Sequence, residues 1–572
     1  MSIQLPIGYD DFAAIIDNKL DFVDKTLFIQ EILDEIITQV ILITRPRRFG
    51  KTLNLSMLHY FLTAETYGCK TKGLFDGLKI AALGEQYMQH QGKYPVIFMT
   101  LKDAKDHSLE AATENLCELI RCAYQEHSYV LNGDTLNQEE KSLYHRMLSR
   151  QISSADLQRS LRNLCEYLSR HTGQKVWLLI DEYDTPIQSA YLHGYYQEMV
   201  SIIRGMFGAA LKTNPYLKKS VITGILRVAK ESLFSGLNNL KVYTLFNSKY
   251  SQYFGFTEQE MTDLLTQSNL TDQANTIRHW YNGYLVGDTV IYNPWSIANC
   301  LNENGLIRPY WVNTSSNDLI RHLLAKGDEE LKEDLSVILS HQPITAWIDE
   351  STVFGNLEKD NSAFWSLLLF SGYLKTASNE MSDTELKMQS NTAFKTQLVP
   401  PNHEVYALYR SIIRSWLEYP MGPTRYESFL NTLTCGDVQR FTERLEDCLQ
   451  NTFSIFDVTG RHPEKFYHGF VLGLMVALES THEVQSNKES GHGRYDVMLI
   501  PKDHSKLGIV LEFKTVTDAN VPLPQAAEEA LQQIIARNYA QTLHSKGIQN
   551  ILQLGLAFYH KTVAAASAVT KD

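Results

Sequence analysis

The stretch Ile41–Leu62 constrains this chain most, because an apolar run, a glycine-containing loop and a helical pattern follow one another in a fixed order. The run Val40–Ile43 predicts a buried strand, and Gly50, Lys51 and Thr52 come just before the helical pattern. In such a loop, backbone N–H groups and a helix N-terminus face phosphates, the lysine reaches phosphate oxygens and the hydroxyl binds Mg²⁺. The sequence therefore predicts a nucleotide-phosphate site here.

The loop departs from the common phosphate-loop pattern at its first position. The pattern G-x-x-x-x-G-K-[ST] has glycine where this chain has Arg45, and Pro46 fixes φ and lacks an N–H donor. We therefore expect fewer backbone donors to face a phosphate. Guanidinium groups bind phosphate bidentately, so Arg47 and Arg48 are candidates for replacing part of the backbone cradle, together with the charge of Arg45. The alternative is that these arginines contact a neighbouring acidic segment.

Two further core strands carry polar residues at their carboxyl ends. Val176–Ile180 precedes Asp181 and Glu182, so Asp181 is a candidate to hold Mg²⁺ and Glu182 to polarise an attacking water. Thr223 and Arg227 lie at or just past the end of a later apolar run, where they are candidates to sense the γ-phosphate and to stabilise transferred charge. The alternatives are a structural Asp-Glu turn, a strand-end hydroxyl and a surface ion pair.

A second constellation lies near the end of the chain. Glu512 and Lys514 share one face of a predicted strand, and Asp496 lies on a neighbouring predicted strand. Two carboxylates beside a lysine suit metal-assisted phosphodiester hydrolysis: the carboxylates hold Mg²⁺ or Mn²⁺, and the lysine orients water or stabilises charge. We therefore interpret Asp496 and Glu512 as metal ligands and assign catalytic roles to all three residues.

Three weaker candidates flank this constellation. Glu464 and His468 share one face of a helix predicted at Glu464–Ser480, and Gln533 lies on a helix predicted at Gln525–His544. A buried histidine bonded to a backbone carbonyl and a solvated glutamine are the alternatives for the last two. The tail after Lys561 is small and polar, and we expect it to be disordered.

Composition limits the classes of protein. The chain has 572 residues, 44% of them hydrophobic, and a net charge of -12, which is typical of globular proteins and argues against non-specific coating of nucleic acid. Alternating apolar runs and helical stretches predict an α/β domain over residues 1–254, a mainly helical coupling region over 255–450 and a second α/β domain over 451–572. The apolar stretch Phe364–Tyr373 reads as a buried helix.

Several motifs together carry a family resemblance. They are RPRRFGKTL, LIDEYDTPI, TGILRVAKESLFSGLNNL, WYNGY and YNPWSI, and the C-terminal Asp496, Glu512 and Lys514 add to them. The chain resembles the bacterial and archaeal AAA-ATPase-like family whose members carry a C-terminal PD-(D/E)xK nuclease-like domain. The resemblance implies a P-loop NTPase domain with a parallel sheet, a helical middle region and a nuclease-like α/β domain. It also makes the arginine-rich loop a family trait, and it implies that a glutamate from the helix before the site, here Glu464, and Gln533 assist the metal site.

From these patterns and the resemblance we expect an ATP-binding protein, an ATPase, that controls a metal-dependent nuclease acting on nucleic acid, with DNA favoured. The expected cofactors are ATP and Mg²⁺, or Mn²⁺ at the nuclease-like site. The alternative is a nucleotide-switched binding module with a catalytically silent nuclease fold. Neither a secretory signal nor a membrane span is visible and the seven cysteines form no C-x-x-C pair, so we expect a cytoplasmic protein with no membrane partner; its oligomeric state is open.

Overall fold

The computed structural model describes most of the chain. The longer described segments are 3–66, 68–226, 237–311, 342–350, 360–377, 393–421, 423–452, 481–486, 493–518 and 520–571; the shorter ones are 331, 334–335, 337–338, 357, 467, 470–471, 473–475, 478 and 489–490. The chain forms two compact units, one of residues 1–319 with 345–404 and one of residues 320–344 with 405–572. Each unit has its own five-stranded sheet.

The sheet of the first unit is parallel, with the strand order β4-β5-β6-β1-β7. Its strands are β1 (Val40–Thr44), β4 (Val96–Thr100), β5 (Val176–Asp181), β6 (Leu217–Gly224) and β7 (Leu240–Tyr243). β1 and β5 contain the predicted runs Val40–Ile43 and Val176–Ile180, and β6 contains the later apolar run that ends near Thr223. These runs are buried because helices cover both faces of the sheet. All five carboxyl ends meet at one edge, where open α/β sheets bind ligands.

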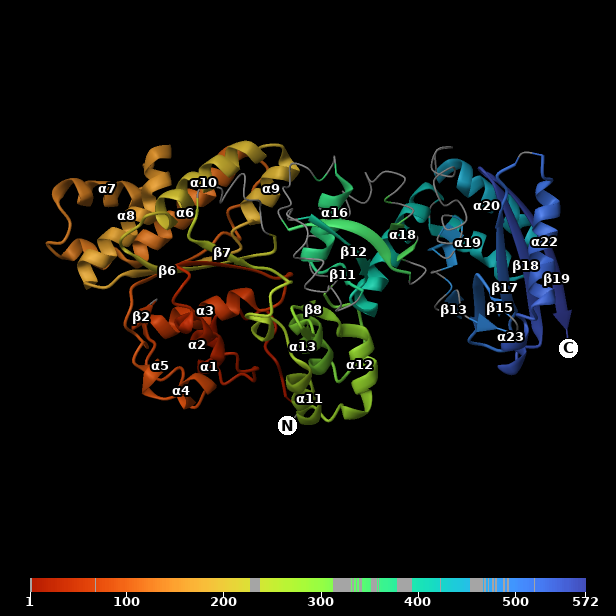
Figure 1. Cartoon of the computed structure of the whole chain (residues 1–572), viewed down its shortest axis with the longest axis horizontal. Coiled ribbons are helices and arrows are strands. Elements are labelled where there is room, and N and C mark those ends of the chain that lie inside the picture. Colours follow the sequence, from red (N-terminus) through yellow and green to blue (C-terminus); the bar gives the residue numbers. More distant parts are fainter. Residues whose placement is uncertain are drawn as a thin grey trace. The chain divides into compact units, whose positions relative to one another are not determined.

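Helices cover this sheet on both sides (Figure 1). α6 contacts β4, α8 contacts β5 and α10 contacts β6. α3 contacts the same three strands, and α1 packs against α3. The helices of this part are α1 (Phe12–Asp17), α2 (Leu27–Asp34), α3 (Lys51–Leu62), α4 (Lys79–Ala82), α5 (Glu85–Met88), α6 (Leu109–Glu126), α7 (Gln138–Leu148), α8 (Ser154–Thr172), α9 (Thr185–His193) and α10 (Tyr196–Leu211). Most of α3 is buried, which places it at the centre of the unit.

The rest of the first unit is helical, as expected, with short strands in addition. Its helices are α11 (Glu258–Gln267), α12 (Ala274–Tyr281), α13 (Pro294–Asn302) and α16 (Asn361–Phe370). The strands β8 (Tyr284–Val286) and β9 (Thr289–Ile291) form a hairpin, and β10 (Ile344–Asp349), β12 (Ala393–Val399) and β11 (Lys375–Thr376) form a three-stranded sheet in that order. α16 confirms the buried helix predicted within Phe364–Tyr373.

The second unit contains the C-terminal sheet, with the order β13-β16-β17-β18-β19. Only β17 and β18 pair in parallel; the other neighbours are antiparallel. The strands are β13 (His482–Ser486), β16 (Val497–Pro501), β17 (Gly508–Thr515), β18 (Asn550–Tyr559) and β19 (Thr562–Lys571), and β14 (Glu489–Ser490) pairs with β15 (Gly493–Arg494). Helices of the described part are α18 (His403–Met421), which begins in the first unit, α19 (Pro423–Thr434), α20 (Val438–Thr452), α22 (Leu523–Ala536) and α23 (Gln541–Ser545).

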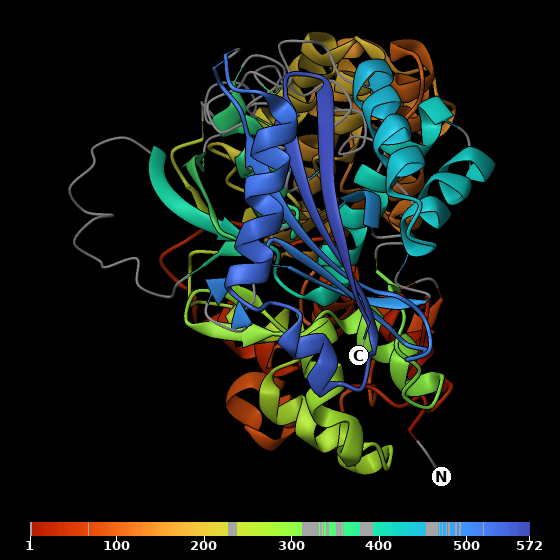
Figure 2. The ribbon, with the colours of Figure 1, turned by 90° about the vertical axis from the view of Figure 1, so that its right-hand side faces the viewer.

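One face of this sheet is covered by α22, as Figure 2 shows. The approach is close at Gly555 of β18, where a Cβ atom would lie 2.3 Å from the carbonyl oxygen of Ala527. Glycine is therefore required there for the helix to reach the strand. Among the helices that the structure describes, none combines the length and the apolar character needed to cross a membrane.

Two expectations about the C-terminal region were wrong. The tail after Lys561 is ordered as β19, which pairs along its whole length with β18. Its small side chains fit a helix-covered strand, since Ala564 and Ala566 pack against the cluster formed by alanines of α22 and β18. The single helix expected over Gln525–His544 is two helices, because the chain leaves the helical conformation at Asn538, where φ is +52°.

Candidate functional site

The predicted phosphate loop lies at the carboxyl edge of the first sheet, between β1 and α3. Gly50 is the N-cap of α3 with φ at +79°, in the left-handed region that glycine adopts without steric cost. Lys51 is the first residue of α3 and Thr52 the second, so both side chains start at the N-terminus of a central helix. The positive end of that helix dipole and its exposed N–H groups suit an anion.

Asp181 joins three elements at this edge. Its Oδ2 accepts a 2.6 Å hydrogen bond from the hydroxyl of Thr52 on α3, and its Oδ1 accepts one from the hydroxyl of Thr223 on β6. The residue is only 1% exposed. Burial raises the pKa of Asp181, while the two threonine bonds lower that pKa because they favour the ionised form. The structure thus brings together the three residues that the sequence placed on separate elements.

Lys51 turns back onto the loop. Its Nζ donates to the carbonyl oxygens of Arg45, at 3.2 Å, and Pro46, at 2.9 Å. Burial lowers the pKa of this lysine, and the charges of Glu182, Asp181 and Asp184 oppose that shift. The ammonium group is therefore held by loop carbonyls, with carboxylates nearby.

Glu182 has an unusual backbone conformation at the end of β5. Its φ is +50°, a left-handed value that is uncommon for a residue with a Cβ and is enriched at functional sites. The half-buried carboxylate accepts a 3.3 Å hydrogen bond from the hydroxyl of Thr185. Burial lowers the pKa of Lys51, and the charge of Glu182 opposes that shift. The predicted role of Glu182 with water stays a prediction.

Arg45 does not lie where a phosphate ligand would. Its side chain is fully buried, and Nη1 donates to the carbonyl oxygens of Thr44, Tyr243 and Thr244 at 2.7–3.2 Å. The guanidinium also lies over the ring of Phe254, 5.5 Å from its centroid, and burial lowers the pKa of Arg45 to about 9. Arg45 ties the ends of β1 and β7 together, which corrects our expectation that its charge holds phosphate.

Arg47 and Arg48 point to two different places. Arg47 Nη2 donates a 3.0 Å hydrogen bond to Oε1 of Gln188 on α9. Arg48 is exposed, has φ at +65°, and stacks over Trp295 with its guanidinium carbon 4.3 Å from the ring centroid. In the structure Arg47 contacts an amide and Arg48 an aromatic ring, and their expected contacts with phosphate stay a prediction.

Sequence reasoning missed Asp184, the second aspartate of the D-E-Y-D segment. It is 1% exposed, and its Oδ2 accepts backbone N–H bonds from Ile225 and Leu226, both 3.0 Å, and a bond from Gln188. Burial raises its pKa and those N–H groups lower it. Asp184 therefore fixes the chain just beyond β6. The sequence signal that could have identified Asp184 is its place two residues after Glu182 in the same motif. Arg227, another predicted site residue, lies outside the described residues.

The second constellation lies on β16 and β17 of the C-terminal sheet. Val497 pairs with Leu511, so Asp496 and Glu512 follow at neighbouring positions, and Asp496 Oδ2 accepts a 2.7 Å bond from the backbone N–H of Phe513. The side chain of Glu512 is 5% exposed. Both carboxylates therefore lie at the same end of the strand pair, with Asp496 beside the neighbouring strand of Glu512 as the sequence predicted.

Helix α22 supplies two contacts to this constellation. Gln533 donates to Oε1 of Glu512, which places this weaker candidate at the site. Lys514 donates to Oε2 of Glu529 at 2.5 Å, and Glu529 is a residue that sequence reasoning missed; its spacing of four from Gln533 was the available signal. Glu464 and His468 lie outside the described residues. Within the described part of the chain, no three His, Cys, Asp or Glu side chains form a metal-binding group.

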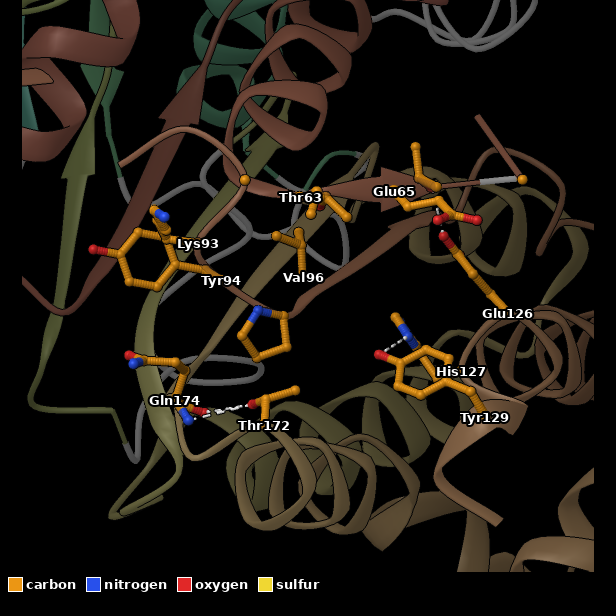
Figure 3. Close-up of a pocket in the computed structure, with 15 residues that line it drawn as sticks. Thr63, Glu65, Lys93, Tyr94, Val96, Glu126, His127, Tyr129, Thr172 and Gln174 are labelled. Carbon is orange, nitrogen blue, oxygen red and sulfur yellow. Dashed lines mark hydrogen bonds between the residues drawn. The ribbon is translucent and has the colours of Figure 1, made fainter. Parts of the chain in front are cut away.

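A cavity of about 540 Å³ lies at the opposite edge of the first sheet, as Figure 3 shows. Pro95 and Gln174, which precede β4 and β5, are among its lining residues. Polar groups in its wall bond to one another: Thr66 donates to Glu126 at 2.8 Å, and His127 Nδ1 lies 3.3 Å from the hydroxyl of Tyr129. Ligands of open α/β sheets bind at the carboxyl ends of the strands, so this cavity is separate from the phosphate loop.

Comparisons with known proteins match both ends of the chain. Residues 6–234 match the family described as "Predicted AAA-ATPase", and residues 462–567 match the PD-(D/E)XK nuclease superfamily. A protein of Azotobacter chroococcum mcd 1, described as an uncharacterized protein in the vnfD 5' region, is 26% identical over 573 residues, which cover 97% of this chain and 96% of that protein. The chain therefore joins an N-terminal domain of the AAA-ATPase-like family to a C-terminal domain of the PD-(D/E)XK nuclease superfamily.

Proposed function

We propose that the first unit binds ATP with Mg²⁺ and hydrolyses it, and that this nucleotide cycle controls a metal-dependent nuclease site in the second unit. The observation that carries the proposal is the bridging of Thr52 and Thr223 by the two oxygens of Asp181. A hydroxyl from the phosphate loop next to an aspartate from a core strand is the pair that holds Mg²⁺ in P-loop NTPases.

The residues present fit a nucleotide with its metal. Asp181 is a buried carboxylate whose pKa is raised by burial, so a divalent cation would offset the cost of its charge. Lys51 would donate to phosphate oxygens in place of the carbonyls of Arg45 and Pro46. The metal, when bound, neutralises charge that develops on the phosphates. Glu182 would orient the attacking water, and Thr223 would keep Asp181 ionised and fixed.

At the nuclease-like site, Asp496 and Glu512 supply two carboxylates, a number that suits Mg²⁺, which usually keeps several waters. Gln533 donates a hydrogen bond to one oxygen of Glu512 and so fixes the plane of the carboxylate. The direction of the other oxygen is set by that plane. Lys514 would exchange Glu529 for a phosphodiester oxygen or a water when a nucleic acid binds. The bound metal would activate the attacking water.

Nucleotide titration by calorimetry tests the first half of the proposal. Wild-type protein with Mg²⁺ should bind ATP, and Lys51→Ala should lose this binding because the ammonium group that pairs with phosphate is gone. Lys93→Ala is the control, because Lys93 is exposed and lies at the opposite edge of the sheet. Lys219→Ala is unsuitable, since Lys219 is buried and donates to a backbone carbonyl. Equal heats from wild type and Lys51→Ala would refute the nucleotide site.

Cleavage assays test the second half. Purified protein is incubated with single- and double-stranded DNA and RNA, with Mg²⁺ or Mn²⁺ and with ATP. Products should appear with the wild type and not with Glu512→Gln, which keeps the shape of the side chain but weakens metal binding. Asp503→Asn, on an exposed turn between β16 and β17, is the matched control and should cleave normally. Cleavage that persists in Glu512→Gln would refute the assigned site.

A further inference from the structure

The phosphate loop is held from outside the sheet at three successive residues. The carbonyl of Arg47 accepts a 3.1 Å bond from the indole N–H of Trp311, Arg48 stacks over Trp295, and the ring of Phe49 meets Tyr284 edge-on at 4.9 Å. We propose that Trp311 and Glu404 are positioning residues for this loop, and that they connect its nucleotide state to helix α18. The proposal rests on the proposed nucleotide site.

Trp311 is well suited to fix the loop backbone. It is 4% exposed, and its ring lies 5.0 Å from that of Tyr373 and 6.3 Å from that of Tyr284. A side chain packed between two rings has little rotational freedom, so the direction of the indole N–H of Trp311 is fixed by this packing and not by the loop. Arg47 directly follows Pro46, whose carbonyl accepts a bond from Lys51, so a displacement of the Arg47 backbone also displaces the loop around Lys51.

Glu404 fixes Trp311 in turn. Its side chain is fully buried; Oε1 accepts a 2.6 Å bond from the backbone N–H of Trp311, and Oε2 accepts a 2.7 Å bond from the hydroxyl of Ser296. Ser296 follows Trp295 on α13, so the same carboxylate anchors both the residue that bonds to Arg47 and the helix that carries the partner of Arg48. Hydrogen bonds to a buried carboxylate are among the stronger ones in proteins.

The position of Glu404 in the chain gives this contact its consequence. Glu404 is the second residue of α18, the first unit ends at Glu404, and the second unit resumes at Val405. A series of contacts thus runs from the phosphate loop through Arg47, Trp311 and Glu404 to the start of α18, where the chain passes into the second unit. When Lys51 exchanges the carbonyls of Arg45 and Pro46 for phosphate, a shift of the loop would change the hydrogen bond at Trp311 and the packing at the start of α18.

Two variants and one control test the proposal. Trp311→Phe keeps the ring but removes the N–H donor, and Glu404→Gln keeps the shape but removes the charge. Trp365→Phe is the control, because Trp365 is about equally buried in the same unit and its ring meets that of Phe364 on the same helix edge-on. Each protein is titrated with ATP and Mg²⁺, and amide exchange of peptides from residues 403–412 is measured with and without saturating nucleotide.

Trp311→Phe should bind ATP about 2- to 10-fold more weakly than wild type, the equivalent of one hydrogen bond of about 0.5–1.5 kcal/mol. At saturation, nucleotide should change exchange at the start of α18 in wild type and Trp365→Phe, and should change it less in Trp311→Phe and Glu404→Gln. A purely structural role for Trp311 would leave this nucleotide-dependent change intact. Normal affinity with a normal exchange response in both variants overturns the inference alone, whereas a wild type that binds no nucleotide overturns the proposed function.

Discussion

Replacement of Thr223 by valine tests the assembly of the nucleotide site most sharply. Valine keeps the branched shape at this fully buried position but removes the hydroxyl that donates to Asp181. Hydrogen bonds to charged groups contribute about 1.5–3 kcal/mol, so the free energy of opening of β6 should fall by about that amount. Ser220→Ala is a matched control on the same strand, because the Ser220 hydroxyl donates at 2.8 Å to the neutral carbonyl of Leu178 and should cost only about 0.5–1.5 kcal/mol.

The dependence of this cost on pH separates a charged acceptor from a neutral one. The Thr223 bond favours the ionised form of Asp181 and lowers its pKa, so its stabilisation is present above that pKa and is lost as pH falls through it. Amide exchange of β5 and β6 in the ligand-free protein, from about pH 8 to about pH 4, measures the opening free energy. Equal costs for Thr223→Val and Ser220→Ala at the higher pH, or a Thr223→Val cost that does not change with pH, would refute the reasoning.

Three further changes have defined outcomes. Asp181→Asn should stabilise the ligand-free protein at neutral pH and abolish Mg²⁺-dependent ATP binding. Burial raises the pKa of Asp181, so the stability that its carboxyl group contributes at low pH is lost as pH rises through that pKa. Thermal unfolding without Mg²⁺ measures the stability, and a variant less stable than wild type contradicts the prediction. Gly555→Ala should cost about 1–3 kcal/mol or more, since its Cβ would meet Ala527, and normal thermal stability would contradict this. Gln533→Leu should weaken Mn²⁺ binding about 10- to 100-fold by calorimetry, with the exposed Gln532→Leu unchanged; equal affinities would contradict a positioning role.

Much of the first sheet was predictable because its strands are continuous apolar runs. Parallel strands covered by helices on both faces need such runs, and their carboxyl ends necessarily share one edge. Thr52, Asp181 and Thr223 could therefore be grouped before the structure was known. The β19 strand was not predictable in this way, because its small residues are selected by the close packing of α22 and not by hydrophobicity.

The arginines of the loop show the limit of reasoning from residue type. Charge next to a lysine and a threonine suggested phosphate contacts for all three, but Arg45 is buried and bonds to strand-end carbonyls, and the stacking of Arg48 on Trp295 was not foreseen. Apart from Thr44, these partners lie about 200 residues or more along the chain from the loop, and only the fold brings them near. The same holds for Glu529, whose pairing with Lys514 depends on where α22 crosses β17.

One measurement tests the central claim most directly, namely that the nucleotide site controls the nuclease-like site. Cleavage of the best nucleic acid substrate is followed with and without ATP for wild type, Lys51→Ala and Glu512→Gln. The account predicts that ATP changes the cleavage rate of the wild type, that Lys51→Ala retains a rate that no longer responds to ATP, and that Glu512→Gln cleaves under neither condition. A Lys51→Ala protein whose cleavage responds to ATP as the wild type does would contradict it.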